Sequence, residues 1–160
     1  MHKSGFINII GNPNVGKSTL MNNLVGEKLS IITSKAQTTR HRILGIVNGE
    51  NFQLIFSDTP GIIKPSYELQ DSMMDFVKSA LEDADVLLYM VEIGEKSIKD
   101  SEVHDKIQSA KIPTIILLNK IDLSTQDDIK NQINIWSNQY PDTEISVSYT
   151  HLTLPTKRIV

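Results

Sequence analysis

One segment near the start of the chain combines the residue types that bind phosphate. Residues 11–18 read GNPNVGKS, which is the pattern G-x-x-x-x-G-K-[ST]. The glycines allow the backbone to curve tightly, so that its N–H groups and the start of the following helix point at phosphate oxygens. Lys17 is a compact positive charge for the β and γ phosphates, and the hydroxyl of Ser18 is suited to Mg²⁺. The pattern therefore predicts a site for a nucleoside triphosphate.

The same pattern indicates which residues contact this nucleotide. An apolar segment precedes the loop and a helical segment follows it, which is the context that the motif requires. This context disfavours the alternative, a structural glycine turn with a surface lysine. The predicted contacts come from Gly11, Asn12, Asn14, Val15, Gly16, Lys17, Ser18 and Thr19.

A second motif, Asn-Lys-Ile-Asp at residues 119–122, indicates which base is bound. It directly follows an apolar strand, and α/β sheets bind ligands at the carboxyl ends of their strands. The carboxylate of Asp122 can accept hydrogen bonds from both N1–H and the 2-amino group of guanine, a pair that adenine does not offer. We therefore expect Asn119, Lys120 and Asp122 to contact guanine. A P-loop ATPase or a small-molecule kinase is the less favoured alternative.

A third motif, Asp-Thr-Pro-Gly at residues 58–61, follows another apolar run. In this position Asp58 would hold Mg²⁺ through water, and the N–H of Gly61 would bind the γ-phosphate. Alone, this sequence would indicate only a turn. Its order after the phosphate-binding loop favours the functional interpretation.

The polar segment 34–42 has no clear periodicity and is expected to carry a second hydroxyl ligand for Mg²⁺. Thr39 is the predicted ligand, with Thr38 as the reserve. The segment belongs to a basic first third, because residues 1–57 have a net charge of +4 and the remainder has −7. A basic region can face phosphate, and a solvent-exposed basic loop is the alternative.

The residue after Gly61 limits the mechanism. Ras-like enzymes have a water-orienting glutamine there, whereas this chain has Ile62, which can neither accept a proton nor orient water. Catalysis is therefore expected to be electrostatic, with Lys17, Thr39 and Gly61 as its residues and Mg²⁺ as its metal. Slow intrinsic hydrolysis, raised by a partner, is the expected behaviour.

These motifs need strands that end near one another. Apolar or β-branched runs predict strands at 5–10, 42–47, 52–56, 85–91, 113–118 and 144–147. Helical spacing predicts helices over 17–25 and from Glu68 onward. The alternation predicts an α/β fold with a mostly parallel sheet, one antiparallel edge strand and helices on both faces. Together with the phosphate loop and the guanine-selecting motif, this fold is expected to be of the P-loop G-domain type.

Two further helices are indicated by their expected first residues. Ser97 with Asp100, and Thr125 with Asp128, have the types and spacing of helix N-caps. Leu69 is expected on the apolar side of the helix that starts near Glu68.

Composition excludes several other classes of protein. The chain has 160 residues, 39% hydrophobic and 22% charged, which fits one globular domain. It has no cysteine, which excludes disulfide scaffolds, thiolate metal sites and cysteine nucleophiles. The apolar run 86–91 is too short to span a membrane, and the first residues lack a signal-peptide pattern. We expect a cytoplasmic protein, and neither peripheral membrane association nor oligomeric state is readable.

Taken together, the motifs resemble the small G domains related to the translational GTPases. Residues 36–42, AQTTRHR, together with GNPNVGKS and DTPG, are similar to the Era family of bacterial ribosome-assembly GTPases, over residues 5–148. The resemblance implies GTP or GDP with Mg²⁺ as ligands, and the small ribosomal subunit with 16S rRNA as partners. Potassium-dependent relatives also imply a K⁺ held by the side-chain oxygen of Asn14, for which a loop-structuring asparagine is the alternative.

The sequence departs from this family near its end. The family carries a C-terminal KH-type RNA-binding domain with a GXXG motif, which this sequence does not contain. In the family, Ser148 would open a Ser-Ala-x motif whose backbone contacts guanine, but Tyr149 follows here and no amphipathic closing helix is indicated. We therefore expect an incomplete GTP-binding domain at 1–148 and a non-native tail at 149–160. A truncated module that binds nucleotide only weakly is the second alternative.

Overall fold

The computed structural model of the chain describes residues 1–27, 30, 39–109 and 112–148. The reserve ligand Thr38 and the expected tail at 149–160 lie outside these ranges. All other candidate site residues lie inside them.

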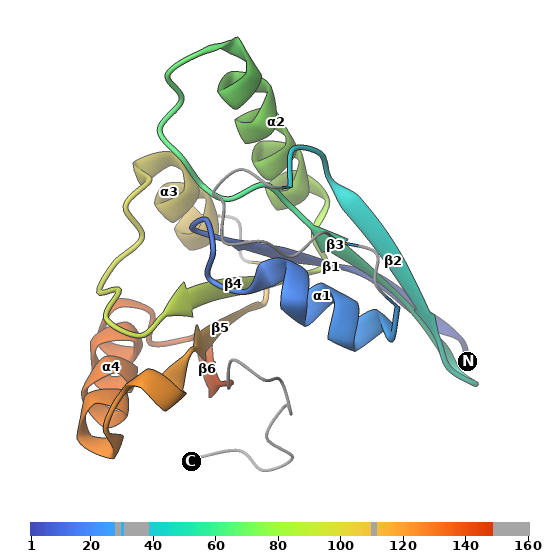
Figure 1. Ribbon diagram of the computed structural model, residues 1–160. Helices are drawn as coiled ribbons and strands as arrows, with labels where there is room; N and C mark the ends of the chain where they lie inside the picture. Colours follow the sequence, from blue (N-terminus) through green and yellow to red (C-terminus); the bar gives the residue numbers. More distant parts are fainter. Residues whose placement is uncertain (28–29, 31–38, 110–111, 149–160) are drawn as a thin grey trace.

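A six-stranded sheet forms the centre of the described structure (Figure 1), and its strands run in the order β2-β3-β1-β4-β5-β6. Within the described residues, β2 is antiparallel to β3 and every other neighbouring pair is parallel. The strands are β1 (Lys3–Gly11), β2 (Ile43–Asn48), β3 (Phe52–Asp58), β4 (Val86–Glu92), β5 (Thr114–Asn119) and β6 (Glu144–Val147). The predicted sheet, mostly parallel with one antiparallel edge strand, is confirmed.

Helices cover both faces of this sheet (Figure 1). On one face, α1 (Lys17–Val25) packs Leu20 and Met21 into a core cluster with strand residues. On the other face, a second cluster joins α2 (Glu68–Asp83), α3 (Ser101–Ser109) and α4 (Gln126–Gln139) to the sheet. The short 3₁₀ helix η1 (Ile121–Leu123) follows β5. No helix of the described residues is long and apolar enough to cross a bilayer.

The parallel strands determine where the site lies. The carboxyl ends of β3, β1, β4 and β5 meet at one edge of the sheet and bring Asp58, Gly11, Glu92 and Asn119 there. The three predicted nucleotide motifs each follow one of these strand ends, as the rule for ligand sites in α/β sheets requires.

Two details of the predicted helices are wrong, and one is confirmed. Helix α3 begins at Ser101, and Asp100 is its cap, because Asp100 Oδ1 accepts from Val103 N at 2.9 Å; Ser97 lies outside the helix. Leu69 is 42% exposed, since α2 turns Met73 and its neighbours to the core instead. Thr125 and Asp128 form the predicted capping box at the start of α4.

Candidate nucleotide-binding site

The loop between β1 and α1 requires its two glycines. Gly11 has φ 156° and Gly16 has φ 109°, and both values lie in the region that L side chains rarely adopt. A Cβ at Gly11 would collide with the carbonyl oxygen of Met90, and one at Gly16 would collide with Nδ2 of Asn119. The loop therefore lies directly against β4 and the end of β5, which explains why these positions lack side chains.

Lys17 is the first residue of α1, and its side chain is held inside the loop. It is 6% exposed, and its ammonium donates to the carbonyl oxygen of Asn12 at 2.7 Å. Burial lowers the pKa of Lys17 to about 8, although the negative charges of Asp58 and Glu95 partly oppose this shift. A desolvated ammonium beside a loop of backbone N–H groups is well suited to meet an anionic ligand.

A carboxylate that the sequence did not reveal lies on the other side of this loop. Glu95 Oε2 accepts from Asn12 Nδ2 at 2.6 Å, and Oε1 accepts from Glu92 N at 3.0 Å. The backbone oxygen of Glu95 accepts from Trp136 Nε1 at 3.1 Å, which fixes the segment against α4. Burial raises the pKa of Glu95, and the nearby charge of Glu92 raises it further.

The three predicted Mg²⁺ ligands lie together. Ser18 Oγ donates to Asp58 Oδ2 at 2.8 Å, and Ser18 Oγ lies 3.2 Å from Thr39 Oγ1. Burial raises the pKa of Asp58, while the hydrogen bond from Ser18 and the charge of Lys17 lower it. Two hydroxyls and a carboxylate form an all-oxygen donor set, which Mg²⁺ prefers.

Ser30, which no sequence motif indicates, lies beside this cluster. Asn22 of α1 holds its backbone through two hydrogen bonds of 2.8 Å, one to Ser30 O and one from Ser30 N. Ser30 is 1% exposed, and its hydroxyl lowers the pKa of Asp58. Within the described residues, neither Ser30 Oγ nor Asp58 Oδ1 has a hydrogen-bond partner. A buried carboxylate oxygen without such a bond fits a place for a hydrated cation.

The second predicted motif is bonded directly to the phosphate loop. Asn119 Nδ2 donates to the carbonyl oxygen of Val15 at 2.8 Å, and Asn119 Oδ1 accepts from Ser148 Oγ at 2.9 Å. Ser148 N also donates to Leu118 O at 2.8 Å, which extends β6 toward the site. Asn119 therefore acts as a brace between β5, the loop and the end of β6.

Lys120 and Asp122 of this motif are more exposed than Asn119. Lys120 has φ 59°, and its ammonium donates to Glu92 Oε2 at 3.0 Å. Asp122 lies on η1 and is exposed, next to the buried Ile121. An exposed carboxylate at this strand end can accept from a ligand in solution.

The third motif approaches the loop closely at Gly61. A Cβ there would lie 2.7 Å from the ring of Pro13, so the residue must be glycine. Ile62 N donates to Gly11 O at 2.9 Å, and Thr59 Oγ1 donates to Ile9 O at 2.8 Å. The side chain of Ile62 is 7% exposed and belongs to the core, so it points away from the site.

The structure thus places every described candidate at one edge of the sheet. Asn14 and Thr19 lie on or just after the loop, and Asn14 has φ 61°, a conformation that asparagine tolerates better than most residues. Glu95 and Ser30 could not have been found from the sequence, because only the fold brings Glu95 to Asn12 and Ser30 to Asp58. The segments that carry them have no motif of their own.

The chain is similar to known GTPases. The family described as 50S ribosome-binding GTPase matches residues 6–120. GTPase Era of Clostridium beijerinckii is 42% identical over 146 residues, which cover 91% of this chain and 49% of that protein. GTPase Era of Clostridium botulinum is also 42% identical over 146 residues, covering 91% of this chain and 50% of that protein.

Solved structures agree with these relatives. A crystal structure of Era in complex with MgGDPNP and nucleotides 1506–1542 of 16S ribosomal RNA has a TM-score of 0.86 and 40% identity, covering 94% of this chain and 52% of that chain. An Aquifex aeolicus Era variant bound to GDP·AlF4⁻ has a TM-score of 0.85 and 40% identity, covering 93% and 52%. The chain spans about half the length of these relatives. The resemblance to the Era family is confirmed, and the chain belongs to the family of 50S ribosome-binding GTPases.

Proposed function

We propose that this chain binds GTP and GDP with Mg²⁺ and hydrolyses GTP slowly, as a molecular switch of the Era type. One observation carries the proposal. Ser18 Oγ lies 3.2 Å from Thr39 Oγ1 and 2.8 Å from Asp58 Oδ2, next to the buried Lys17. The guanine-nucleotide domain would occupy residues 1–148. The support from relatives is that solved Era structures contain MgGDPNP or GDP·AlF4⁻.

Each part of the nucleotide would have its own set of residues. The loop N–H groups of residues 11–19 and the Lys17 ammonium would bind the phosphates. Asp122 would accept from the base, with Asn119, Lys120 and Ser148 around it. Ser18, Thr39 and Asp58 would hold Mg²⁺, which would neutralise charge on the phosphates.

Hydrolysis would rest on charge rather than on a side-chain base. Ile62 faces the core and cannot orient water. Lys17 and the Gly61 N–H would instead stabilise charge that develops on the phosphate oxygens. Thr39 would contribute as a ligand of Mg²⁺. With no glutamine to position water, the intrinsic rate is low, and a partner is needed to raise it.

We also propose that Asn14 helps to hold a K⁺ near the phosphates. Its positive φ places it at the bend of the loop, where its side-chain oxygen can join phosphate oxygens around a monovalent cation. A cation there would take part of the role of an arginine finger.

The proposed setting is small-subunit maturation in the cytoplasm, with 16S rRNA as partner. The support is that one similar Era structure contains nucleotides 1506–1542 of 16S ribosomal RNA. The basic first third, with a net charge of +4, would contribute a weak and salt-sensitive attraction to RNA.

Displacement of a bound, fluorescently labelled guanine nucleotide by unlabelled nucleotides tests the proposal. Unlabelled GTP and GDP should displace the probe, ATP should not, and removal of Mg²⁺ should weaken GTP binding. Displacement by ATP as effectively as by GTP would favour the ATPase or kinase alternative. Single-turnover GTP hydrolysis, run in K⁺ and in Na⁺, separates a catalyst from a binding module, and equal rates in both salts would leave Asn14 as a structural residue.

A further inference from the structure

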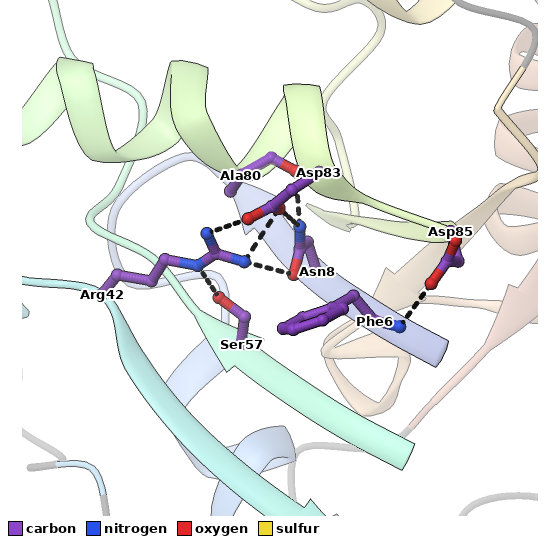
Figure 2. A network of polar contacts seen from close by, with 7 residues as sticks. All are labelled: Phe6, Asn8, Arg42, Ser57, Ala80, Asp83 and Asp85. Carbon is purple, nitrogen blue, oxygen red and sulfur yellow. Dashed lines mark hydrogen bonds and ion pairs between the residues drawn. The ribbon is translucent and has the colours of Figure 1, made fainter. Parts of the chain in front are cut away.

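Arg42 forms a polar network with Asn8, Ser57 and Asp83 (Figure 2). Its Nη1 and Nη2 donate to the two carboxylate oxygens of Asp83 at 2.5 and 2.9 Å. Its Nε donates to Ser57 Oγ at 2.6 Å, and Nη2 also donates to Asn8 Oδ1 at 3.1 Å. One side chain therefore connects the start of β2 with β3, β1 and the end of α2.

The partners of Arg42 are themselves fixed. Asn8 and Ser57 are 0% exposed, and Asn8 Nδ2 donates to Ala80 O at 2.5 Å and to Asp83 Oδ1 at 2.7 Å. The side chain of Arg42 is 14% exposed, and that of Asp83 is 43% exposed. A bidentate arginine–carboxylate pair whose arginine also bonds to two buried side chains is more restrained than a single ion pair.

Two residues of the network are close in sequence to proposed Mg²⁺ ligands. Ser57 directly precedes Asp58, and successive residues of a strand face opposite sides, so the two side chains point to the two faces of β3. Arg42 directly precedes Ile43, which pairs with Asp58 in the β2–β3 register. Thr39 lies only three residues before Arg42, at 3.2 Å from Ser18.

We propose that Arg42 is a positioning residue, which fixes the segment that brings Thr39 to Ser18 and Asp58 and ties that segment to α2. This inference rests on the proposed function, because it concerns the same Mg²⁺ site. The hydrogen bonds of Arg42 go to Asn8, Ser57 and Asp83, so its effect on the site would act through Thr39.

Loss of Arg42 should affect the binding of GTP and of GDP differently. In GTPases, contacts to the γ-phosphate and Mg²⁺ order the segment that corresponds to the one carrying Thr39. A diphosphate lacks the γ-phosphate, so its binding does not depend on that order. Loss of Arg42 should therefore weaken binding of the triphosphate form and leave the diphosphate form nearly unchanged. A merely structural role would weaken both by a similar factor.

The test compares Arg42→Ala with Arg42→Lys in the full chain, by calorimetry with MgGMPPNP and with GDP. For Arg42→Ala we expect a loss of about tenfold or more for MgGMPPNP and a change within about twofold for GDP. Arg42→Lys should rescue only partly, because one ammonium cannot replace the bidentate fork and the bond to Ser57.

Two control variants match the changes of charge and contact. Arg40→Ala removes an exposed arginine from the same segment, and Lys106→Ala removes an exposed ion pair to α2, the 3.3 Å contact with Glu82. Both should leave MgGMPPNP affinity within about twofold. If Arg40→Ala weakened MgGMPPNP as much as Arg42→Ala does, the effect would be one of net charge and the proposal would be wrong.

A double-mutant cycle with Thr39→Ala tests whether Arg42 acts through Thr39. If it does, Arg42→Ala should cost about tenfold in the unsubstituted background and less than about threefold in the Thr39→Ala background. Additive losses, or equal losses of GDP and MgGMPPNP with a lower melting temperature, would overturn the inference. A chain that binds neither nucleotide before any substitution would overturn the proposed function, and this inference with it.

Discussion

Asn119 Nδ2 lies 2.8 Å from the carbonyl oxygen of Val15, so the proposed base-binding motif is bonded to the proposed phosphate-binding loop. The same amide accepts from Ser148 Oγ, and Asn119 is 3% exposed. The proposed base-binding and phosphate-binding parts of the site would therefore already be fixed relative to each other before a nucleotide binds. Preorganisation of this kind lowers the cost of ordering groups when a ligand binds.

The first prediction concerns this brace. Asn119→Ala removes both hydrogen bonds and leaves the buried Val15 carbonyl without its donor, which should lower the free energy of unfolding by roughly 1–3 kcal/mol. GDP affinity should fall as well, since the loop loses its support. Thermal unfolding and calorimetry measure the two effects. Asn23→Ala, which removes an exposed amide of α1, is the control and should change neither.

The second prediction concerns the choice of base. Asp122→Ala should weaken GDP binding by roughly 10- to 100-fold, because a charge-assisted hydrogen bond to a ligand is worth about 1.5–3 kcal/mol. Asp122→Asn should shift the preference toward xanthine nucleotides, whose base offers the complementary pattern. Asp127→Ala, at an exposed carboxylate in the first turn of α4, is the matched control. Unchanged GDP affinity in Asp122→Ala would contradict the assignment of this residue.

The third prediction uses the low pKa of Lys17. Burial lowers that pKa from 10.5 to about 8, so between these values the unfolded chain binds more protons than the folded chain. Without nucleotide, stability should therefore rise with pH across this window, and at pH 7 the buried charge destabilises the fold. Lys17→Met should then raise the stability of the nucleotide-free chain at pH 7 by roughly 1–3 kcal/mol, while abolishing triphosphate binding.

Melting temperatures measured from pH 7 to pH 10.5 check this sign. The difference between Lys17→Met and the unsubstituted chain should shrink as pH rises through about 8, because Lys17 then loses its proton in the folded state. Lys130→Met, at an exposed lysine of α4, should show no such trend. A Lys17→Met chain that melts lower at pH 7 would show that the buried ammonium stabilises the fold instead.

The fourth prediction is that Ile62 takes no part in the chemistry. Ile62→Val should leave single-turnover hydrolysis within about threefold, and Ile62→Ala within about tenfold, the larger change reflecting the cavity left in the core. Lys17→Ala, in contrast, should remove hydrolysis together with most triphosphate binding. A thousandfold loss in Ile62→Val, with an unchanged circular dichroism spectrum, would refute the prediction.

The sequence was sufficient wherever the residues of a feature are close together in the chain. The phosphate loop and the Thr125–Asp128 capping box are contiguous patterns whose geometry follows from local backbone chemistry, and both lie where the sequence predicts them. Their place at one sheet edge also followed, because parallel strands have only one carboxyl edge.

The sequence was insufficient where partners are far apart or where two residues fit one role. Glu95 reaches Asn12 across 83 positions, and Arg42 reaches Asp83 across 41, so no local pattern could reveal either contact. Ser97 and Asp100 both have side chains that cap helices, and packing of Val103 into the core decides in favour of Asp100.

The last prediction concerns Glu95, whose carboxylate lies against the phosphate loop through Asn12 at 2.6 Å. A negative charge there opposes the phosphates of a ligand, and this opposition is the reason to expect that Glu95 weakens nucleotide binding. Glu95→Gln removes the charge and keeps one acceptor, while Asn12 can rotate its amide to restore the contact. The affinity for GTP should therefore rise by roughly two- to tenfold.

Burial also raises the pKa of Glu95, so its carboxyl gains a proton at a higher pH than an exposed glutamate does. As pH falls through that raised pKa, the unsubstituted chain should lose the repulsion, and its GTP affinity should approach that of Glu95→Gln. Calorimetry on both chains at neutral and mildly acidic pH measures this convergence, with Glu50→Gln in the exposed β2–β3 turn as the control. If Glu95→Gln bound GTP more weakly at neutral pH, the carboxylate would be a support of the loop, and its hydrogen bonds to Asn12 and Glu92 would matter more than its charge.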